Sequence, residues 1–230
     1  GLFAALLLAR SGYRPLVLER GPALDERIRA VSHFEKTGEL NPNANIQFGE
    51  GGAGTFSDGK LTTRVGDPLC AFVTRAFLDH GAPADIAWRQ KPHVGTDLLR
   101  DVIRSIRGEI ESLGGEVRFN TALTGLQIRN GALTGIDTTA GSVACEQLIL
   151  AVGHSARDTF AMLHELGLPL ACKPFSVGFR AEHLQTEIDK SLYHGAAGHP
   201  ALPKGEYQLS QHVGGGRCVY TFCMCPGGTV

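Results

Sequence analysis

Five glycines stand close together between Asn45 and Leu61, in the stretch NIQFGEGGAGTFSDGKL. Glycine loses more backbone freedom on folding than any other residue, so this density indicates a backbone that must lie close against something. Bare N–H groups in a glycine-rich turn point outward as donors, which favours a flat or anionic ligand. A flexible linker is the alternative. Phe48, Phe56 and Leu61 argue against a linker, because they supply anchoring apolar side chains along the stretch.

The residues before this loop have the pattern of a dinucleotide-binding unit. Ala- and Leu-rich residues from Leu2 to Arg10 predict a buried helix, and the apolar run Leu16–Leu18 predicts a parallel strand. In the full fingerprint, the third glycine lets helix and strand pack closely, and an acid about 20 residues from the motif's start binds a ribose hydroxyl. Gly1 fits that glycine and Glu19 fits the acid. A solvated acid at a strand end is the alternative for Glu19.

The composition is that of an ordinary globular protein. The 230 residues are 43% apolar and 20% charged, and the net charge of −1 gives no reason to expect nucleic acid or a membrane as partner. The longest apolar run, Leu2–Ala9, is far shorter than the roughly 20 residues of a membrane span. Six irregularly spaced cysteines favour a reducing cytoplasm. The abrupt first and last residues predict a fragment truncated at both ends.

Hydrophobic periodicity predicts an α/β fold in two parts. Helices are expected at Leu2–Arg10, within Pro22–Glu39, and at Pro68–Asp79, Asp97–Leu113 and Ala156–Leu166. Strands are expected at Leu16–Leu18, Val117–Asn120, Leu123–Arg129, Ala132–Thr138, near Val143 and at Gln147–Val152. Residues 1–172 are predicted to form a Rossmann-like dinucleotide-binding domain with a three-stranded antiparallel excursion. Residues 173–230 are predicted to start a mainly β substrate or insert domain, with strands at Phe175–Ala181, Tyr207–Gln211 and Cys218–Phe222.

The Asp97–Leu113 helix has the clearest pattern in the chain. Its apolar residues form one stripe, while Arg100, Arg104 and Arg107 are expected to face outward with the acids between them. Thr96 is the expected N-cap.

Several motifs together resemble a group of bacterial and plant proteins described as uncharacterised FAD-dependent dehydrogenases, which are related to the broader HI0933-like flavoproteins. The motifs are GEGGAGTFSDGKL from Gly49 to Leu61, LERG from Leu18 to Gly21, PHVGTD from Pro92 to Asp97, AVGHSARD from Ala151 to Asp158, and FCMCPGG from Phe222 to Gly228. The resemblance implies a Rossmann-like FAD/NAD(P)-binding domain built from two separated halves of the chain. It also implies that the first strand and a closing C-terminal segment lie outside these residues.

The resemblance assigns roles to residues at the expected cofactor site. Glu19 is expected to accept hydrogen bonds from the adenosine ribose, and Arg20 to lie along the nucleotide or on the surface. The glycine loop is expected to pass the pyrophosphate and the flavin ring, with Thr55 or Ser57 as a donor. Main-chain groups near Val117 are expected to meet the adenine. The full expected cofactor-binding set is Gly1, Glu19, Arg20, Gly49, Gly51, Gly52, Gly54, Thr55, Ser57, Gly59, Val117, Ala151 and Gly153.

His154 and Arg157 are the candidate catalytic residues. Arg157 would stabilise the negative charge of a reduced flavin, and its alternative is to pair with Asp158 or to cap a helix. A histidine such as His154 or His93 can relay protons near neutral pH, although most histidines do not. Lys60 would contact phosphate or substrate, or is a solvated lysine.

The cysteines near the C-terminal end leave a second chemistry open. Cys223 and Cys225, with Cys218 nearby, would form a redox pair or part of a metal site. Zinc sites usually contain CxxC-type pairs with two further ligands, so no metal site is predicted, and packing as small apolar residues is the alternative.

The sequence therefore predicts an FAD-dependent oxidoreductase that moves a hydride or electrons between a small-molecule substrate and FAD. NAD(P)H is a candidate reductant, although no second complete G-x-G-x-x-G is present. The alternatives are a non-catalytic flavin-binding or sensor protein, and a thiol-linked redox protein that uses Cys223 and Cys225. The substrate and the oligomeric state stay open.

Overall fold

The computed structural model describes residues 1–56, 59, 61, 63, 65–89, 92, 94–222 and 224. The chain divides into two compact units, Gly1–Leu170 and Ala171–Val230. The expected residues Ser57, Lys60, His93, Cys223 and Cys225 lie outside the described part of the chain.

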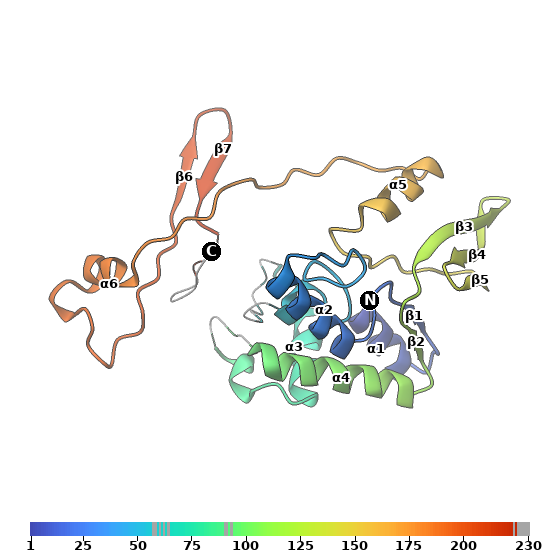
Figure 1. Ribbon diagram of the computed structural model, residues 1–230, viewed down its shortest axis with the longest axis horizontal. Coiled ribbons are helices and arrows are strands. Elements are labelled where there is room, and N and C mark those ends of the chain that lie inside the picture. The colour runs from blue at the N-terminus through green and yellow to red at the C-terminus, as the bar shows by residue number, and fades with distance from the viewer. Residues whose placement is uncertain are drawn as a thin grey trace. The chain divides into compact units, whose positions relative to one another are not determined.

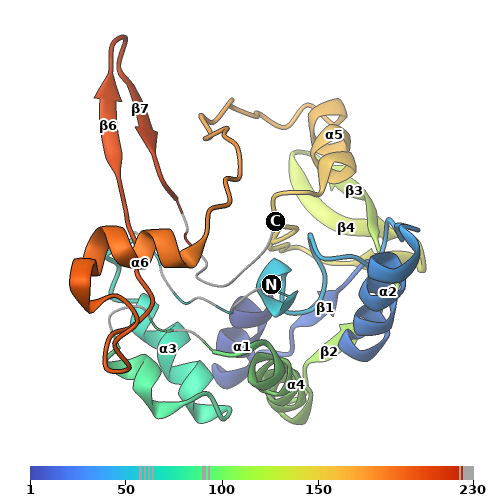
Figure 2. The same ribbon diagram turned by 60° about the vertical axis from the view of Figure 1, so that its left-hand side comes forward.

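The first unit contains a parallel pair of strands against which helices pack (Figures 1 and 2). Strand β1 (Leu16–Leu18) pairs with β2 (Glu116–Arg118), and Val17 lies opposite Val117. Helix α1 (Leu2–Arg10) contacts β1, and α4 (Thr96–Ser112) contacts both α1 and β2. The predicted order of helix, strand, helix and returning strand is therefore confirmed for these elements.

The core of this unit is the junction of α1 and α4 with the helices beside them. Five residues of the α4 stripe are buried, as the periodicity predicted. Further elements that contribute to the unit are α2 (Leu24–Thr37), α3 (Cys70–Asp79), and two short 3₁₀ helices, η1 (Ala53–Phe56) and η2 (Ala84–Ala87). Within the described residues, no helix combines the length and the apolar character that a bilayer crossing requires.

The basic side of α4 differs from the expectation that it faces water. Arg104 pairs with Asp25 on α2, Arg107 Nε lies 3.0 Å from Glu50 Oε1, and the Arg100 guanidinium stands over the Phe56 ring. Thr96 is the first helical residue and Gly95 the N-cap, so the expected Thr96 cap is wrong. The arginines of α4 therefore connect this helix to α2 and to the glycine loop.

A cluster of charged side chains joins α1, α3 and α4. Arg10 donates to both carboxylate oxygens of Glu109, at 2.7 and 2.8 Å. His80 Nε2 lies 2.8 Å from the same carboxylate, and His80 Nδ1 lies 2.7 Å from Ser105 Oγ. Hydrogen bonds from Arg10, with the His80 ring as a smaller cause, hold the pKa of Glu109 below its usual value.

Replacing Glu109 with glutamine is expected to lower stability at pH 7 by about 1 kcal/mol, since the bidentate pair with Arg10 is lost. The folded pKa of Glu109 lies below the unfolded value, so this stability is present above the unfolded pKa, roughly 4.3. It is lost as the pH falls through the folded pKa. Thermal midpoints of wild type and Glu109→Gln should therefore converge between pH 7 and pH 3. Glu111→Gln, on the same helix, is the control, and a constant gap at every pH would contradict the prediction.

An antiparallel sheet follows β2, as predicted. It has the order β3 (Leu123–Arg129), β4 (Ala132–Thr138) and β5 (Gly141–Ala144). The turn residues Asn130 and Gly131 both have positive φ, of 52° and 77°, which is the conformation that Asn-Gly adopts in a two-residue hairpin. Helix α5 (Arg157–Glu165) packs against β3.

The predicted strand Gln147–Val152 is not present as a strand. Its backbone is irregular, and Ile149 and Leu150 are 61% and 40% exposed. A strand requires a neighbour for its N–H and C=O groups. No described segment pairs with residues 147–152, so this apolar segment has no neighbouring strand to form hydrogen bonds with.

The second unit contains a helix and a hairpin. Helix α6 (Gln185–Tyr193) is followed by η3 (His194–Ala196), and β6 (Ser210–Val213) pairs antiparallel with β7 (Arg217–Tyr220). The prediction of a mainly β unit did not include α6, which Gln185–Asp189 and Glu187–Lys190 side-chain contacts support locally. Residues 175–181, also expected as a strand, have no assigned secondary structure, and Phe175 and Phe179 are exposed.

Candidate functional site

The carboxyl end of β1 places Glu19 in a tight turn. The Glu19 N–H donates to the Arg118 carbonyl, and the Glu19 carbonyl accepts from the Thr121 N–H, both at 2.9 Å. Its side-chain Oε1 accepts from the Gly21 N–H at 2.8 Å. A Cβ on Gly21 would lie 2.6 Å from the Asn43 carbonyl oxygen, so only glycine fits this turn. The local backbone therefore holds the Glu19 carboxylate at the strand end.

Glu19 is only partly exposed to water. Burial raises its pKa, while the Gly21 N–H and the charges of Arg27 and Arg20 act in the opposite direction. No described residue donates a hydrogen bond to its second oxygen, Oε2. Glu19 is therefore a partly dehydrated acceptor with capacity for a hydroxyl donor.

Two expected site residues far apart in sequence meet beside this turn. Gly1 is the N-cap of α1, and a Cβ built on it would lie 4.0 Å from the Ala151 Cβ. Val117 lies half-buried in β2, directly beside Val17. The first helix, the β1–β2 pair and the segment before α5 therefore converge on one region.

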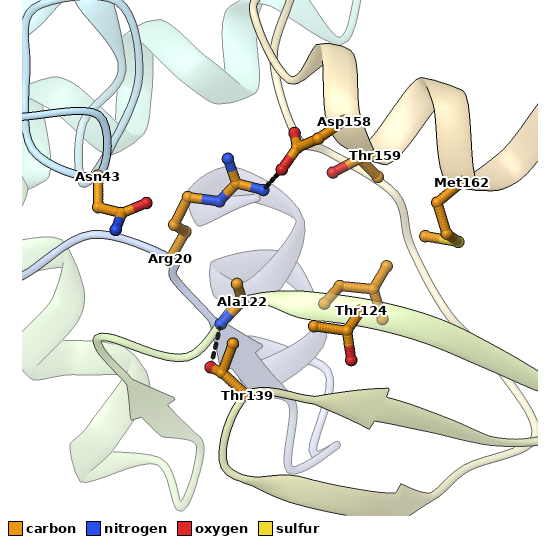
Figure 3. Close-up of a pocket in the computed structure, with 9 residues that line it drawn as sticks. Arg20, Asn43, Ala122, Thr124, Thr139, Asp158, Thr159 and Met162 are labelled. Atoms are coloured by element: carbon orange, nitrogen blue, oxygen red, sulfur yellow. Dashed lines mark hydrogen bonds and ion pairs between the residues drawn. The ribbon is translucent and has the colours of Figure 1, made fainter.

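An open pocket of about 350 Å³ lies next to this region (Figure 3). Its walls come from five places: the turn after β1, the loop after α2, the β2–β3 connection with the start of β3, the residue that follows β4, and the first turns of α5. The lining residues are Arg20, Asn43, Ala122, Leu123, Thr124, Thr139, Asp158, Thr159 and Met162. This volume lies at the lower end of the range for ligand pockets, about 300–1,000 Å³.

Arg20 crosses the pocket to Asp158, as Figure 3 shows. The hydrogen bond from Arg20 holds the pKa of Asp158 below its usual value. Asp158 is in the first turn of α5, where a carboxylate also meets the helix N–H groups. The guanidinium also lies 6.0 Å from the Phe48 ring centroid. Arg20 is thus placed between the glycine-loop segment and α5, within reach of an anionic ligand.

The glycines of the loop fall into two classes. A Cβ on Gly49 would lie 2.8 Å from Arg27 Nε, one on Gly51 2.3 Å from Thr55 Oγ1, and one on Gly59 1.9 Å from the Val94 carbonyl oxygen. A Cβ on Gly52 or Gly54, by contrast, would have no heavy atom of a described residue within 4 Å beyond its chain neighbours. The first three glycines therefore serve close packing within the protein, and the other two have room for a ligand.

Arg27 and Glu50 are the site residues that the sequence did not suggest. Arg27 is fully buried, and its guanidinium donates to the carbonyls of Asn45, Glu50 and Ile46 at 3.0, 2.7 and 3.2 Å. Glu50 Oε2 accepts the Leu24 N–H at the start of α2, at 2.7 Å. The available signal was the position of Arg27 on the apolar face of α2, between the buried Leu24 and Val31.

Burial dominates the electrostatics of this pair. It lowers the pKa of Arg27 to about 10, against the opposing effect of the Glu19 and Glu50 carboxylates. It also raises the pKa of Glu50, which the Leu24 N–H and Arg107 partly offset. The buried Thr55 hydroxyl lies 3.4 Å from the Glu50 carbonyl, so it faces the protein interior.

The candidate catalytic residues lie on an exposed turn. Gly153 has a φ of 78° with open space beside it, and His154 and Arg157 are exposed at the start of α5. Asp158 pairs with Arg20, and not with Arg157. Arg157 therefore makes no ion pair within the described part of the chain.

Comparisons with known proteins give the following similarities. Residues 174–230 match a family model described as FAD-dependent protein, C-terminal domain-like. The chain is 49% identical over its whole length to a Clostridium beijerinckii protein described as uncharacterized, of which it covers 43%.

Two solved structures resemble the chain at low identity. Glycine oxidase from Bacillus cereus is 13% identical with a TM-score of 0.43, covering 73% of this chain and 57% of that one. L-Amino acid deaminase from Proteus myxofaciens in complex with anthranilate is 14% identical with a TM-score of 0.37, covering 74% of this chain and 46% of that one. The chain thus spans 43% to 57% of the length of these relatives.

Proposed function

We propose that this chain is the FAD-binding part of an FAD-dependent oxidoreductase. The observation that carries the proposal is the partly dehydrated Glu19 carboxylate, which is fixed at the carboxyl end of a parallel strand. Its Oε2 accepts no hydrogen bond from a described residue. The end of such a strand is where dinucleotide-binding units hold a ribose. The match of residues 174–230 to a family described as FAD-dependent supports the same cofactor.

The described residues fit the nucleotide half of such a cofactor. Glu19 would accept from the ribose hydroxyls, and Arg20 and the pocket beside it would take the adenosine. The space at the Cβ positions of Gly52 and Gly54 would let the pyrophosphate and flavin pass close to the chain. Ala151 and Gly153 would pass beneath the nucleotide. Bound FAD would supply hydride and electron transfer, while the protein supplies orientation and electrostatics.

The finer parts of the proposal concern the reaction. His154 would move protons and Arg157 would stabilise negative charge on the reduced flavin, since both side chains are exposed on a turn near Ala151. The reaction would move a hydride or electrons between a small molecule and FAD in the cytoplasm. With NAD(P)H as the reductant of FAD, the small molecule would be the electron acceptor.

An absorbance spectrum of the full-length protein as purified, followed by anaerobic addition of NADH or NADPH, tests the proposal. Flavin bands that bleach would support an FAD enzyme with a nicotinamide reductant. Bands that persist would support bound FAD but would rule out NADH and NADPH as its reductants. Absence of flavin bands, even after reconstitution with FAD, would overturn the proposal.

Arg20→Gln and Asp158→Asn are expected to change FAD affinity in opposite directions. Arg20 would face an anionic cofactor, so its loss should raise the Kd about 10-fold, whereas removing the carboxylate that neutralises Arg20 should lower it about 3-fold. Flavin fluorescence titrations at low and high salt provide the measurement, with the exposed Arg129→Gln as the control. A shift in the same direction for both variants would contradict the assignment.

A further inference from the structure

Arg27 sits inside the glycine loop as its central hydrogen-bond donor. Its guanidinium binds three backbone carbonyls, of Asn45, Ile46 and Glu50, that lie within six residues of one another. The planar fork of arginine can serve several acceptors at once, which a lysine ammonium on a flexible stem does poorly. A charge with no exposed surface is stable here because these carbonyls and the nearby carboxylates replace water.

The loop is shaped around this side chain. Gly49 lies so close to Arg27 that a Cβ would stand 2.8 Å from Nε and 2.9 Å from Cδ. The Phe56 ring at the other end of the loop has its centroid 4.7 Å from the Arg27 Cζ, within the range of a cation–π contact. Contacts from residue 45 to residue 56 thus converge on one guanidinium.

Glu50 links the same loop to α2. Its backbone carbonyl accepts from Arg27, while its carboxylate accepts the first N–H of the helix that carries Arg27. Helix and loop are therefore joined by two contacts, at Arg27 and at Leu24, in both of which α2 donates and Glu50 accepts. These contacts hold the backbone of residues 45–56, which includes Gly52 and Gly54, in one conformation.

We propose that Arg27 is the positioning residue of the flavin site: it locks residues 45–56 in the conformation that presents Gly52 and Gly54 to the cofactor. This inference rests on the proposed function. A loop that is ordered before binding loses less conformational entropy when the ligand arrives, so the lock increases affinity without touching FAD.

The test compares Arg27→Lys with Arg29→Lys in the full-length protein. Arg29 lies on the same helix, but its side chain is 71% exposed. Hydrogen exchange of the FAD-free protein should be about 10-fold faster in peptides spanning 45–56 of Arg27→Lys, while α4 peptides keep wild-type rates. The FAD Kd from flavin fluorescence should rise about 10-fold. Arg29→Lys should match wild type in both measurements.

Each other result overturns the inference. Unchanged loop exchange in Arg27→Lys would show that Arg27 does not hold the loop, whether or not wild type binds FAD. Faster loop exchange with an unchanged Kd would show that the loop's order does not matter for the cofactor. A wild type that binds no FAD would overturn the proposed function, and the exchange data would then still decide whether Arg27 holds the loop.

A second pair of variants covers the case in which Arg27→Lys does not fold. Both glycines have a positive φ, of 116° and 72°, so alanine is strained at each. Gly49→Ala should loosen the loop further because its methyl group also meets Arg27, whereas a methyl group at Gly52 meets no described heavy atom within 4 Å. Exchange in peptides spanning 45–56 should therefore be faster in Gly49→Ala than in Gly52→Ala. Equal exchange in the two variants would overturn the inference.

Discussion

Replacing Gly59 with alanine is expected to destabilise the first unit by about 2–5 kcal/mol. Gly59 has a φ of 62°, and a Cβ there would lie 1.9 Å from the Val94 carbonyl oxygen. A left-handed conformation costs a non-glycine residue about 1–2 kcal/mol, and overpacking a buried position costs about 1–3 more. The backbone cannot move away freely, because the Val94 N–H donates to the Gly59 carbonyl and the Leu61 N–H to the Pro92 carbonyl. Differential scanning calorimetry should therefore show a clearly lower midpoint.

Gly54→Ala is the matched control in the same loop. Among the described residues, beyond its chain neighbours, no heavy atom lies within 4 Å of its Cβ position. Its φ is not in the left-handed region, so its midpoint should stay at the wild-type value. If FAD approaches the backbone at Gly54, this variant should instead weaken FAD binding. Equal midpoints for Gly59→Ala and Gly54→Ala would contradict the distinction between packed and open glycines.

Local sequence signals correctly predicted the elements in which the hydrophobic pattern and the turn residues favour the same structure. The stripe of α4, the Ala- and Leu-rich α1 and the Asn130–Gly131 hairpin are each specified by residues within a few positions of one another. For these elements, hydrophobic pattern and backbone preference favour the same structure. The predictions therefore fall within a residue or two of the observed bounds.

The wrong predictions involve partners distant in the chain. Residues 147–152 have the apolar pattern of a buried strand, but whether such a segment forms a strand depends on a neighbour that the pattern does not specify. Helix α6 buries none of its residues, so its formation does not depend on an apolar face that the sequence would reveal. The arginines of α4 look solvated in sequence, and their contacts with Asp25 and Glu50 come from segments more than 50 residues away.

The candidate site shows the same division. The position of Glu19 at the end of β1 follows from a local strand pattern, and the structure places it there. The buried position of Glu50 does not follow from any local pattern. The place of Arg27 on the apolar face of α2 is a local signal, but it does not predict burial by itself, because a charged residue is usually exposed unless it has partners. Only the folded loop supplies the carbonyls that make a buried guanidinium at position 27 stable.

Glu19→Gln is expected to weaken FAD binding about 100-fold while leaving the FAD-free protein as stable as wild type or more so. The amide keeps the size of the carboxyl group but offers a weaker acceptor to the two ribose hydroxyls, and hydrogen bonds to a charged group are each worth about 1.5–3 kcal/mol. Tenfold in affinity corresponds to about 1.4 kcal/mol, so two weakened bonds account for this loss. Flavin fluorescence titration measures it directly.

The stability half of this prediction follows from the raised pKa of Glu19. Because burial favours the protonated form in the folded state, the folded protein binds protons more tightly there than the unfolded chain does. Stability therefore falls as the pH rises from the unfolded pKa through the folded pKa, and the buried charge is unfavourable at pH 7. Removing that charge should leave the thermal midpoint at pH 7 unchanged or higher, with the exposed Glu35→Gln as the control for both measurements. Loss of stability together with loss of FAD binding would instead mean that Glu19 is a structural residue, and the nucleotide assignment would lose its main support.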